Sequence, residues 1–169
     1  VVGLADASLR TIRHEDRRIE EWLAEAGADS VALIDIGEIG FRGTLEITDL
    51  GGLTDPVIGR APGGRLAKRF DLDYLFDERA PDAIVLRLER EPPLDPGCEG
   101  TVAAEDLRAS VERRVHGGPR LGRDYRLHRA LIPDYGRTPL YGRLLYLRRD
   151  SGIPPPAGDC RVSVAPRKR

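Results

Sequence analysis

The stretch Val31–Asp55, VALIDIGEIGFRGTLEITDLGGLTD, decides the fold that we predict for this chain. It opens with a nearly continuous apolar run, which predicts a strand at Val31–Ile36 that is covered on both faces. Glycines at positions 37, 40 and 43 then predict a tight turn. A second short strand is expected at Thr44–Thr48, before an acidic and glycine-rich loop. Buried strands with such loops at their ends are typical of an open α/β sheet.

Carboxylates fall at or just after the ends of these predicted strands. Ligands bind open α/β sheets at the carboxyl ends of the strands, so we expect Asp35, Glu38, Asp49 and Asp55 to share one crevice there. Such groups suit sugar hydroxyls or a divalent cation. The alternative is that they accept backbone N–H groups in turns and that Asp55 caps a short helix beginning at Pro56. The spacing fits no metal-binding template, and we predict neither a metal nor a cofactor.

The remaining pattern predicts a three-layer α/β domain with a mixed sheet, parallel in its first part and with an antiparallel hairpin at one edge. Helices are expected at 11–27, 71–79 and 103–116, and strands at 83–88, 125–131 and 140–147. Arg126, His128 and Arg143 alternate with apolar residues, which predicts a solvent-facing side of the hairpin. We expect a single domain over residues 1–150 and a proline-rich tail over 151–169, with Arg161–Val164 as a candidate edge strand.

The charge distribution excludes one class of partner. The net charge of −1 argues against nucleic-acid binding. The segment Leu107–Arg149 nevertheless holds eleven arginines against three acids. This segment is expected to form either a solvated basic face or a contact with anionic lipid head groups. The sequence contains no methionine, from which we expect the chain to be a piece of a longer protein.

Catalytic motifs are missing from the sequence. The serines lack a nucleophile-elbow context, and the three histidines lie on unrelated predicted elements. The segment GEIGFRG departs from the dinucleotide-binding pattern and is followed by a predicted strand, so no nucleotide site is expected. Tyr135 and Arg137, in the PDYGR loop, are the best exposed candidates for carbohydrate or partner contact. Cys98 and Cys160 either form a disulfide, in an oxidising compartment, or remain free thiols.

Several segments, in this order, resemble the C-terminal extracytoplasmic domain of bacterial polytopic membrane glycosyltransferases of the GT-C type. This group includes the dolichyl-phosphate-mannose-mannosyltransferase-like and arabinosyltransferase-like membrane proteins. The similar segments are RRIEEWLAE (17–25), VALIDIGEIGF (31–41), ITDLGGLTDPVIGR (47–60), FDLDYLFDERAPDAIVL (70–86), YRLHRALIPDYG (125–136) and LYGRLLYLRR (140–149). In such proteins a bundle of membrane helices carries the catalytic acid in an early extracytoplasmic loop, and none of that machinery is in this chain.

The resemblance implies a non-catalytic accessory domain in an extracytoplasmic, membrane-tethered setting. Such a domain would bind or position a glycan acceptor or a polyprenyl-phosphate-linked substrate, or dock on the transmembrane part of the same polypeptide. The residues alone leave a second reading open. In it the chain is a free-standing α/β hydrolase or transferase that uses a crevice formed by Asp35, Asp49 and Asp55.

Overall fold

The computed structural model describes residues 16–42, 45–95, 97–133, 142–155 and 157–164. Residues 16–25 are helical, within the helix that the sequence predicts. The elements that follow are β1 (Ser30–Leu33), α2 (Gly37–Arg42), β2 (Glu46–Asp49), α3 (Pro56–Arg60), η1 (Tyr74–Arg79), β3 (Ala83–Arg87), η2 (Ala104–Asp106), α4 (Ser110–Gly117), α5 (Pro119–Asp124), β4 (Tyr125–Pro133), β5 (Arg143–Arg148) and β6 (Arg161–Val164).

The strands form one mixed sheet in the order β2-β1-β3-β5-β4-β6. The β2-β1-β3 part is parallel, and β5 runs antiparallel to both β3 and β4. This confirms the predicted α/β fold with its mixed sheet. The candidate strand Arg161–Val164 also forms, as β6, and it pairs with β4 in parallel. The antiparallel β4–β5 pair therefore lies one strand in from the edge.

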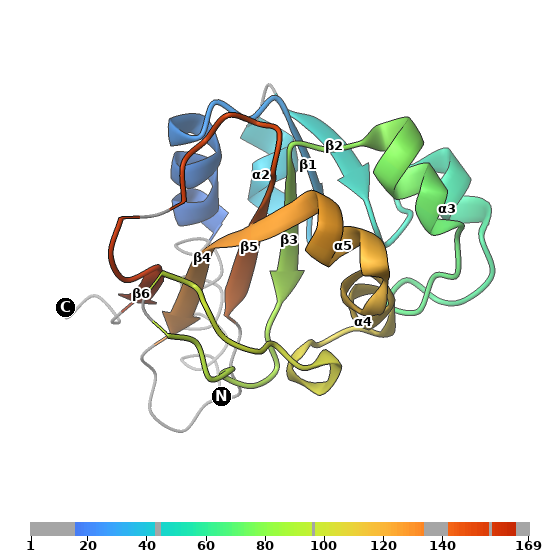
Figure 1. The fold of residues 1–169 in the computed structure, drawn as a ribbon. Coiled ribbons are helices and arrows are strands. Elements are labelled where there is room, and N and C mark those ends of the chain that lie inside the picture. The colour runs from blue at the N-terminus through green and yellow to red at the C-terminus, as the bar shows by residue number, and fades with distance from the viewer. Residues whose placement is uncertain (1–15, 43–44, 96, 134–141, 156, 165–169) are drawn as a thin grey trace, which may run out of the picture.

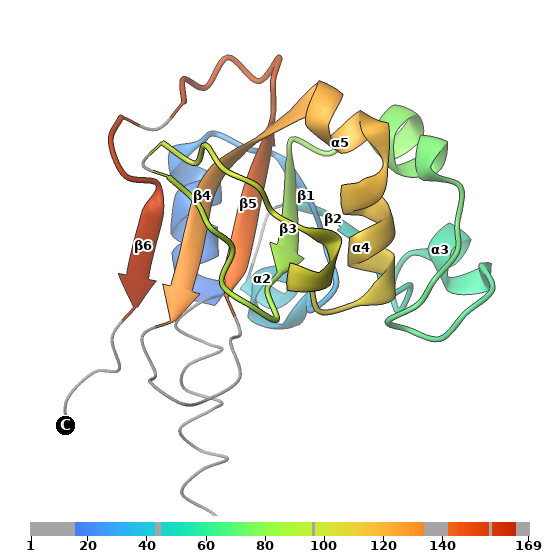
Figure 2. The same ribbon diagram turned by 60° about the horizontal axis from the view of Figure 1, so that its bottom comes forward.

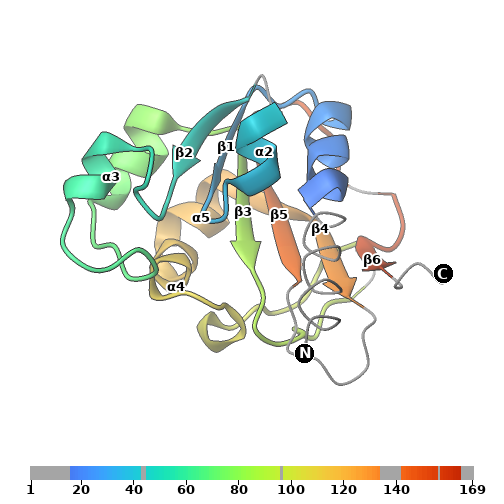
Figure 3. The same cartoon turned by 180° about the vertical axis from the view of Figure 1, so that it is seen from behind.

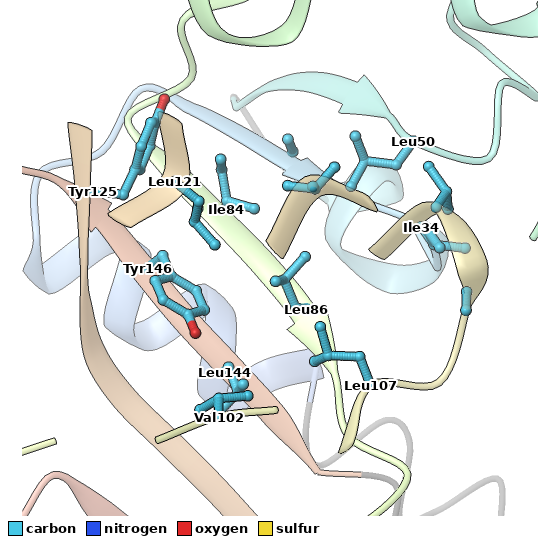
Figure 4. Packing of buried hydrophobic residues seen from close by; sticks show 14 of the residues in the cluster. Ile34, Leu50, Ile84, Leu86, Val102, Leu107, Leu121, Tyr125, Leu144 and Tyr146 are labelled. Carbon is cyan, nitrogen blue, oxygen red and sulfur yellow. The ribbon is translucent and has the colours of Figure 1, made fainter. Parts of the chain in front are cut away.

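Helices cover both faces of the sheet and create two hydrophobic cores. Figures 1 and 3 show α4 and α5 on one face, and α2 with the N-terminal helix on the other. On the α4 side, Leu107, Val111 and Val115 are fully buried, and Figure 4 shows Leu107 in the cluster with Leu86 and Tyr146. On the opposite side, Ile19, Trp22 and Leu23 pack against the sheet. These two cores make the fold three-layered.

The predicted glycine turn at 37–43 is wrong, because residues 37–42 form α2. A tight turn joins antiparallel strands, whereas β1 and β2 are parallel and need a crossover between them. Ile39 is buried to 1% exposure and attaches this crossover to the core. The first strand is also shorter than predicted and ends at Leu33.

The predicted helix at 103–116 forms as two separate pieces, η2 and α4. Leu107 leaves the helical path because it forms an isolated antiparallel bridge with Leu88 at the end of β3. The sequence analysis also missed α5, which begins at Pro119, where a proline ring suits the first helical turn.

The predicted solvent-facing side of the hairpin is also wrong. Arg143 is buried, and nitrogen atoms of Arg126 and His128 are buried as well. The reason is that β4 and β5 are interior strands, with β6 outside them and helices on both faces.

Cys98 and Cys160 form a disulfide, with 5.4 Å between their Cα atoms. It joins the loop after β3 to the residue that precedes β6. Cys160 is fully buried, and its carbonyl accepts the Ala130 N–H at 3.1 Å. The edge strand β6 is thus attached to the rest of the domain in two ways. The disulfide attaches it covalently, and parallel pairing attaches it to β4. Figure 2 shows β6 at one end of the sheet and α3 beyond the other.

Candidate functional site

The carboxyl ends of the three parallel strands meet at one edge of the sheet. Asp35 follows β1, Asp49 is the last residue of β2, and Arg87 is the last residue of β3. Arg143 of β5 is the register partner of Arg87, so two buried arginines lie side by side at this edge. Like charges on directly opposite residues repel each other, so carboxylates are needed nearby to neutralise these two arginines.

Asp49 is fully buried and bonds to the backbone of its own loop. Its Oδ1 accepts the Gly51 N–H at 2.8 Å, and its Oδ2 accepts the N–H groups of Leu53 and Thr54 at 2.5 and 3.1 Å. This is the turn-forming role of an aspartate, and it leaves the carboxylate little capacity to bind a ligand.

Asp55 is the N-cap of α3. Its Oδ1 accepts the N–H groups of Val57 and Ile58, both at 2.9 Å, as the capping alternative predicts. Its Oδ2 accepts the Tyr74 hydroxyl at 2.9 Å. Burial raises the pKa of Tyr74, and the Asp55 carboxylate raises it further. Both oxygens of Asp55 are therefore engaged inside the fold.

Asp35 is the carboxylate that remains accessible. Its side chain is 38% exposed and lies between two arginines, with Oδ2 at 2.7 Å from Arg87 Nη1 and Oδ1 at 2.8 Å from Arg65 Nη2. Burial raises the pKa of Asp35, but Arg87, helped by Arg143 and Arg65, outweighs burial and lowers it overall. Asp35 is consequently ionised at neutral pH and does not act as a proton donor.

Glu112 neutralises Arg87 from the opposite side. It lies in the first turn of α4 and is fully buried. Its Oε1 accepts Arg87 Nε at 3.0 Å and the Arg87 backbone N–H at 2.8 Å, while Oε2 accepts the Ala109 N–H at 2.9 Å. Burial lowers the pKa of Arg87, but Glu112 and Asp35 outweigh it and raise the pKa overall. Four alternating charges therefore run from α4 to the surface, in the order Glu112, Arg87, Asp35, Arg65.

Arg65, Arg87 and Glu112 are functional candidates that were not predicted from the sequence. A signal for two of them was present, because Arg87 is a cation at the end of an apolar strand and must be paired when buried. Glu112 lies three residues after Ala109, where a carboxylate can bond the N-cap backbone. Nothing in the sequence indicates Arg65, which reaches Asp35 from a loop 30 positions away.

The side chains of three predicted site residues lie outside the described part of the chain. Glu38 falls within α2, and its side chain lies outside the described residues. Tyr135 and Arg137 also lie outside them. Within the described part of the chain, no group of three or more His, Cys, Asp or Glu side chains is arranged to hold a metal ion.

The three aspartates at this edge are all engaged by contacts within the fold. Asp49 and Asp55 are engaged by backbone amides, and Asp35 is held ionised between arginines, so the three do not provide a paired general acid and base. Asp35 and Arg65 instead present an acceptor and a donor side by side at the surface. This arrangement does not favour the crevice enzyme.

Residues 5–148 match the family described as "Domain of unknown function (DUF8728)". The chain belongs to the DUF8728 family. No curated protein and no solved structure matches the chain significantly. Among the described residues of this DUF8728 chain, no helix is long and apolar enough to cross a bilayer. The Cys98–Cys160 disulfide is consistent with an oxidising compartment.

Proposed function

We propose that this DUF8728 domain is a non-catalytic accessory domain of a membrane glycosyltransferase-like protein. In this proposal it works outside the cytoplasm and positions a glycan acceptor or a polyprenyl-phosphate-linked sugar. The single observation that carries the proposal is the exposed pair of Asp35 and Arg65 at the carboxyl edge of the sheet. The ordered resemblance of the sequence to extracytoplasmic domains of such proteins supports the setting.

The Asp35–Arg65 pair suits a polyhydroxylated ligand. A carboxylate accepts hydrogen bonds from two neighbouring hydroxyls, and a guanidinium donates to hydroxyl or phosphate oxygens. Arg87 and Glu112 keep Asp35 in place from behind, so the acceptor is ordered before a ligand arrives. Such preorganisation lowers the entropic cost of binding.

Hydrogen bonding, more than stacking, would carry this recognition. Trp22, Tyr125 and Tyr146 are each at most 8% exposed, and Tyr74 packs against the core. The rings of Trp22, Tyr125 and Tyr146 are therefore not free to act as sugar platforms. Tyr135, which lies outside the described residues, remains a predicted candidate for carbohydrate or partner contact.

The proposal is tested by NMR titration of the 15N-labelled chain with neutral oligosaccharides and with a short-chain isoprenyl-phosphate sugar. Amide shifts are expected around Asp35, the loop after β2, and Arg65. Asp35→Asn is expected to weaken binding tenfold or more, as loss of charge-assisted hydrogen bonds implies. Absence of shifts with all of these ligands would disprove the binding function.

Glu21→Gln provides a matched control. Glu21 also lies between two arginines, with Oε1 at 3.2 Å from Arg17 Nε and Oε2 at 3.3 Å from Arg18 Nη1, and its side chain is 40% exposed. It lies on the N-terminal helix, which covers a face of the sheet rather than its carboxyl edge. Equal weakening by both substitutions would mean that the effect is one of net charge alone.

A further inference from the structure

In the arginine-rich segment 107–149, several of the described arginines serve the fold. Arg120 bonds Asp77 and Asp124, with contacts of 2.6 and 2.7 Å. Arg114 donates to the carbonyl oxygens of Lys68 and Phe70, at 2.9 and 3.0 Å. These arginines are engaged by groups of the fold itself.

Residues 50–69, which we call the α3 lobe, expose both aliphatic and cationic side chains. Leu53, Val57 and Leu66 are 65%, 46% and 45% exposed, and they are the exposed large hydrophobic residues of the described chain. Arg60 and Arg69 are also exposed, and their side chains form no ion pair or hydrogen bond with the part of the chain that the structure describes. Large aliphatic side chains in water are unfavourable, and all three that the described chain exposes fall within this one segment, which points to an interaction surface.

The lobe is a built structure and not a loose loop. A Cβ on Gly52, whose φ is +72°, would lie 2.7 Å from the Gly59 nitrogen, so the loop after β2 packs directly on α3. Lys68 Nζ donates to the carbonyl oxygens of Gly59 and Ala61, at 2.7 and 3.1 Å, and folds the following loop back onto α3. The Val111 N–H then bonds the Leu66 carbonyl at 3.1 Å. The exposed side chains of the α3 lobe are therefore attached to a backbone that is fixed by these contacts.

The charge of the α3 lobe identifies the partner. The lobe contains four basic residues and one acid, Asp55, which is buried as the helix cap. Its exposed charges are consequently all positive, and they accompany aliphatic side chains without an exposed carboxylate from the lobe itself. Arginine beside leucine and valine matches a bilayer interface, where phosphates lie above acyl chains. We propose that the α3 lobe binds the surface of an anionic lipid bilayer.

In this arrangement Leu53, Val57 and Leu66 enter the head-group and acyl boundary, while Arg60 and Arg69 contact lipid phosphates. Figures 1 and 2 show α3 beyond β2, at the end of the sheet opposite β6. Lipid contact at α3 therefore leaves β4 and β6 away from the bilayer. The surface is distinct from the segment 107–149, where the sequence composition alone suggests lipid contact.

The test is co-sedimentation of the full chain with vesicles of phosphatidylcholine containing 30% phosphatidylglycerol, with pure phosphatidylcholine vesicles as reference. Binding is expected to the anionic vesicles and to weaken with added salt. The double substitution Arg60→Gln/Arg69→Gln is expected to lower the partition coefficient about fivefold for each arginine. Leu53→Ser/Val57→Ser is expected to lower it about tenfold or more at equal net charge.

The control is Arg17→Gln/Arg18→Gln, which removes the same charge from exposed positions on the N-terminal helix. The proposal is overturned if this control weakens binding as much as the lobe variant does, if pure phosphatidylcholine binds equally, or if the wild-type chain binds neither vesicle. It is also overturned if Leu53→Ser/Val57→Ser instead dissolves a dimer of the chain in sedimentation velocity. Asp35→Asn is expected to retain or strengthen vesicle binding, because it removes a negative charge beside Arg65, while it weakens glycan binding; the opposite signs separate the two proposals.

Discussion

Glu112 accepts three hydrogen bonds from Arg87, from its backbone N–H and from two guanidinium nitrogens, at 2.8, 3.0 and 3.3 Å. The same carboxylate accepts the Ala109 N–H and so caps α4. One buried side chain therefore fastens a helix to the end of β3 and fixes the arginine that holds Asp35. The candidate site depends on this contact although Glu112 itself is fully buried.

Glu112→Gln is expected to destabilise the domain by about 3–5 kcal/mol, because it leaves the Arg87 charge buried without its main partner. The measurement is the free energy of unfolding from urea denaturation. Glu89→Gln is the control, since Glu89 pairs with Arg108 at 3.9 Å on the surface, and its loss should cost less than about 1 kcal/mol. Equal costs for the two variants would contradict the role assigned to Glu112.

Asp35 is expected to titrate below its ordinary value of 3.8 in 13C-detected NMR. Because the folded pKa is lowered, this residue contributes stability that is present above pH 3.8 and is lost as the pH falls through the folded pKa. Arg65→Gln should raise the pKa of Asp35 only in part, since Arg87 remains in place. Arg17→Gln should leave it unchanged. A pKa of Asp35 at or above 3.8 in the wild-type chain would refute the ion-pair geometry.

Gly52→Ala is expected to destabilise the α3 lobe by more than the cost of its backbone conformation. Gly27→Ala is the matched control, because the φ values are similar, +72° and +65°, while a Cβ on Gly27 would meet nothing within 4 Å. The control should cost about 1 kcal/mol, as expected for a non-glycine residue in the left-handed region. Gly52→Ala should cost clearly more in thermal unfolding, because its Cβ meets Gly59 backbone atoms. Equal losses would show that the close approach is unimportant.

Reduction of the Cys98–Cys160 disulfide is expected to lower stability by about 4 kcal/mol, the loop-closure value for a separation of 62 residues. Unfolding curves with and without dithiothreitol provide the measurement. The variant Cys98→Ser/Cys160→Ser should be destabilised similarly and should not respond to the reductant. If the wild-type chain shows no response either, the disulfide contributes nothing to the folded state.

His128 is expected to make stability depend on pH. Burial, together with Arg129 and Arg126, lowers its pKa to about 4 from 6.5. As the pH falls, His128 therefore takes up its proton at a higher pH in the unfolded chain than in the folded chain. The free energy of unfolding should consequently fall as the pH drops from 6.5 towards 4. His128→Gln should flatten this dependence in urea titrations at pH 7 and pH 4.5. A residual dependence of stability on pH is expected from His116, because burial also lowers the pKa of that side chain.

The sequence predicted the elements whose signals are local. The apolar strands and the cap at Asp55 both follow from residues that lie close together in the sequence. Parallel pairing at the start of the sheet and β6 at its edge were also predicted. The role of Asp49 at the carboxyl edge is structural, because its carboxylate accepts backbone N–H groups of its own loop.

The tertiary structure alone decided which charges meet. The contacts of Glu112 with Arg87 and of Arg65 with Asp35 span 25 and 30 positions, and no local pattern encodes them. It also decided that Gly37–Arg42 is a crossover helix and that Arg143 is buried, because both depend on which strands become neighbours. Local chemistry fixes helices, strands and caps, whereas the pairing of buried charges is settled only when the layers pack together.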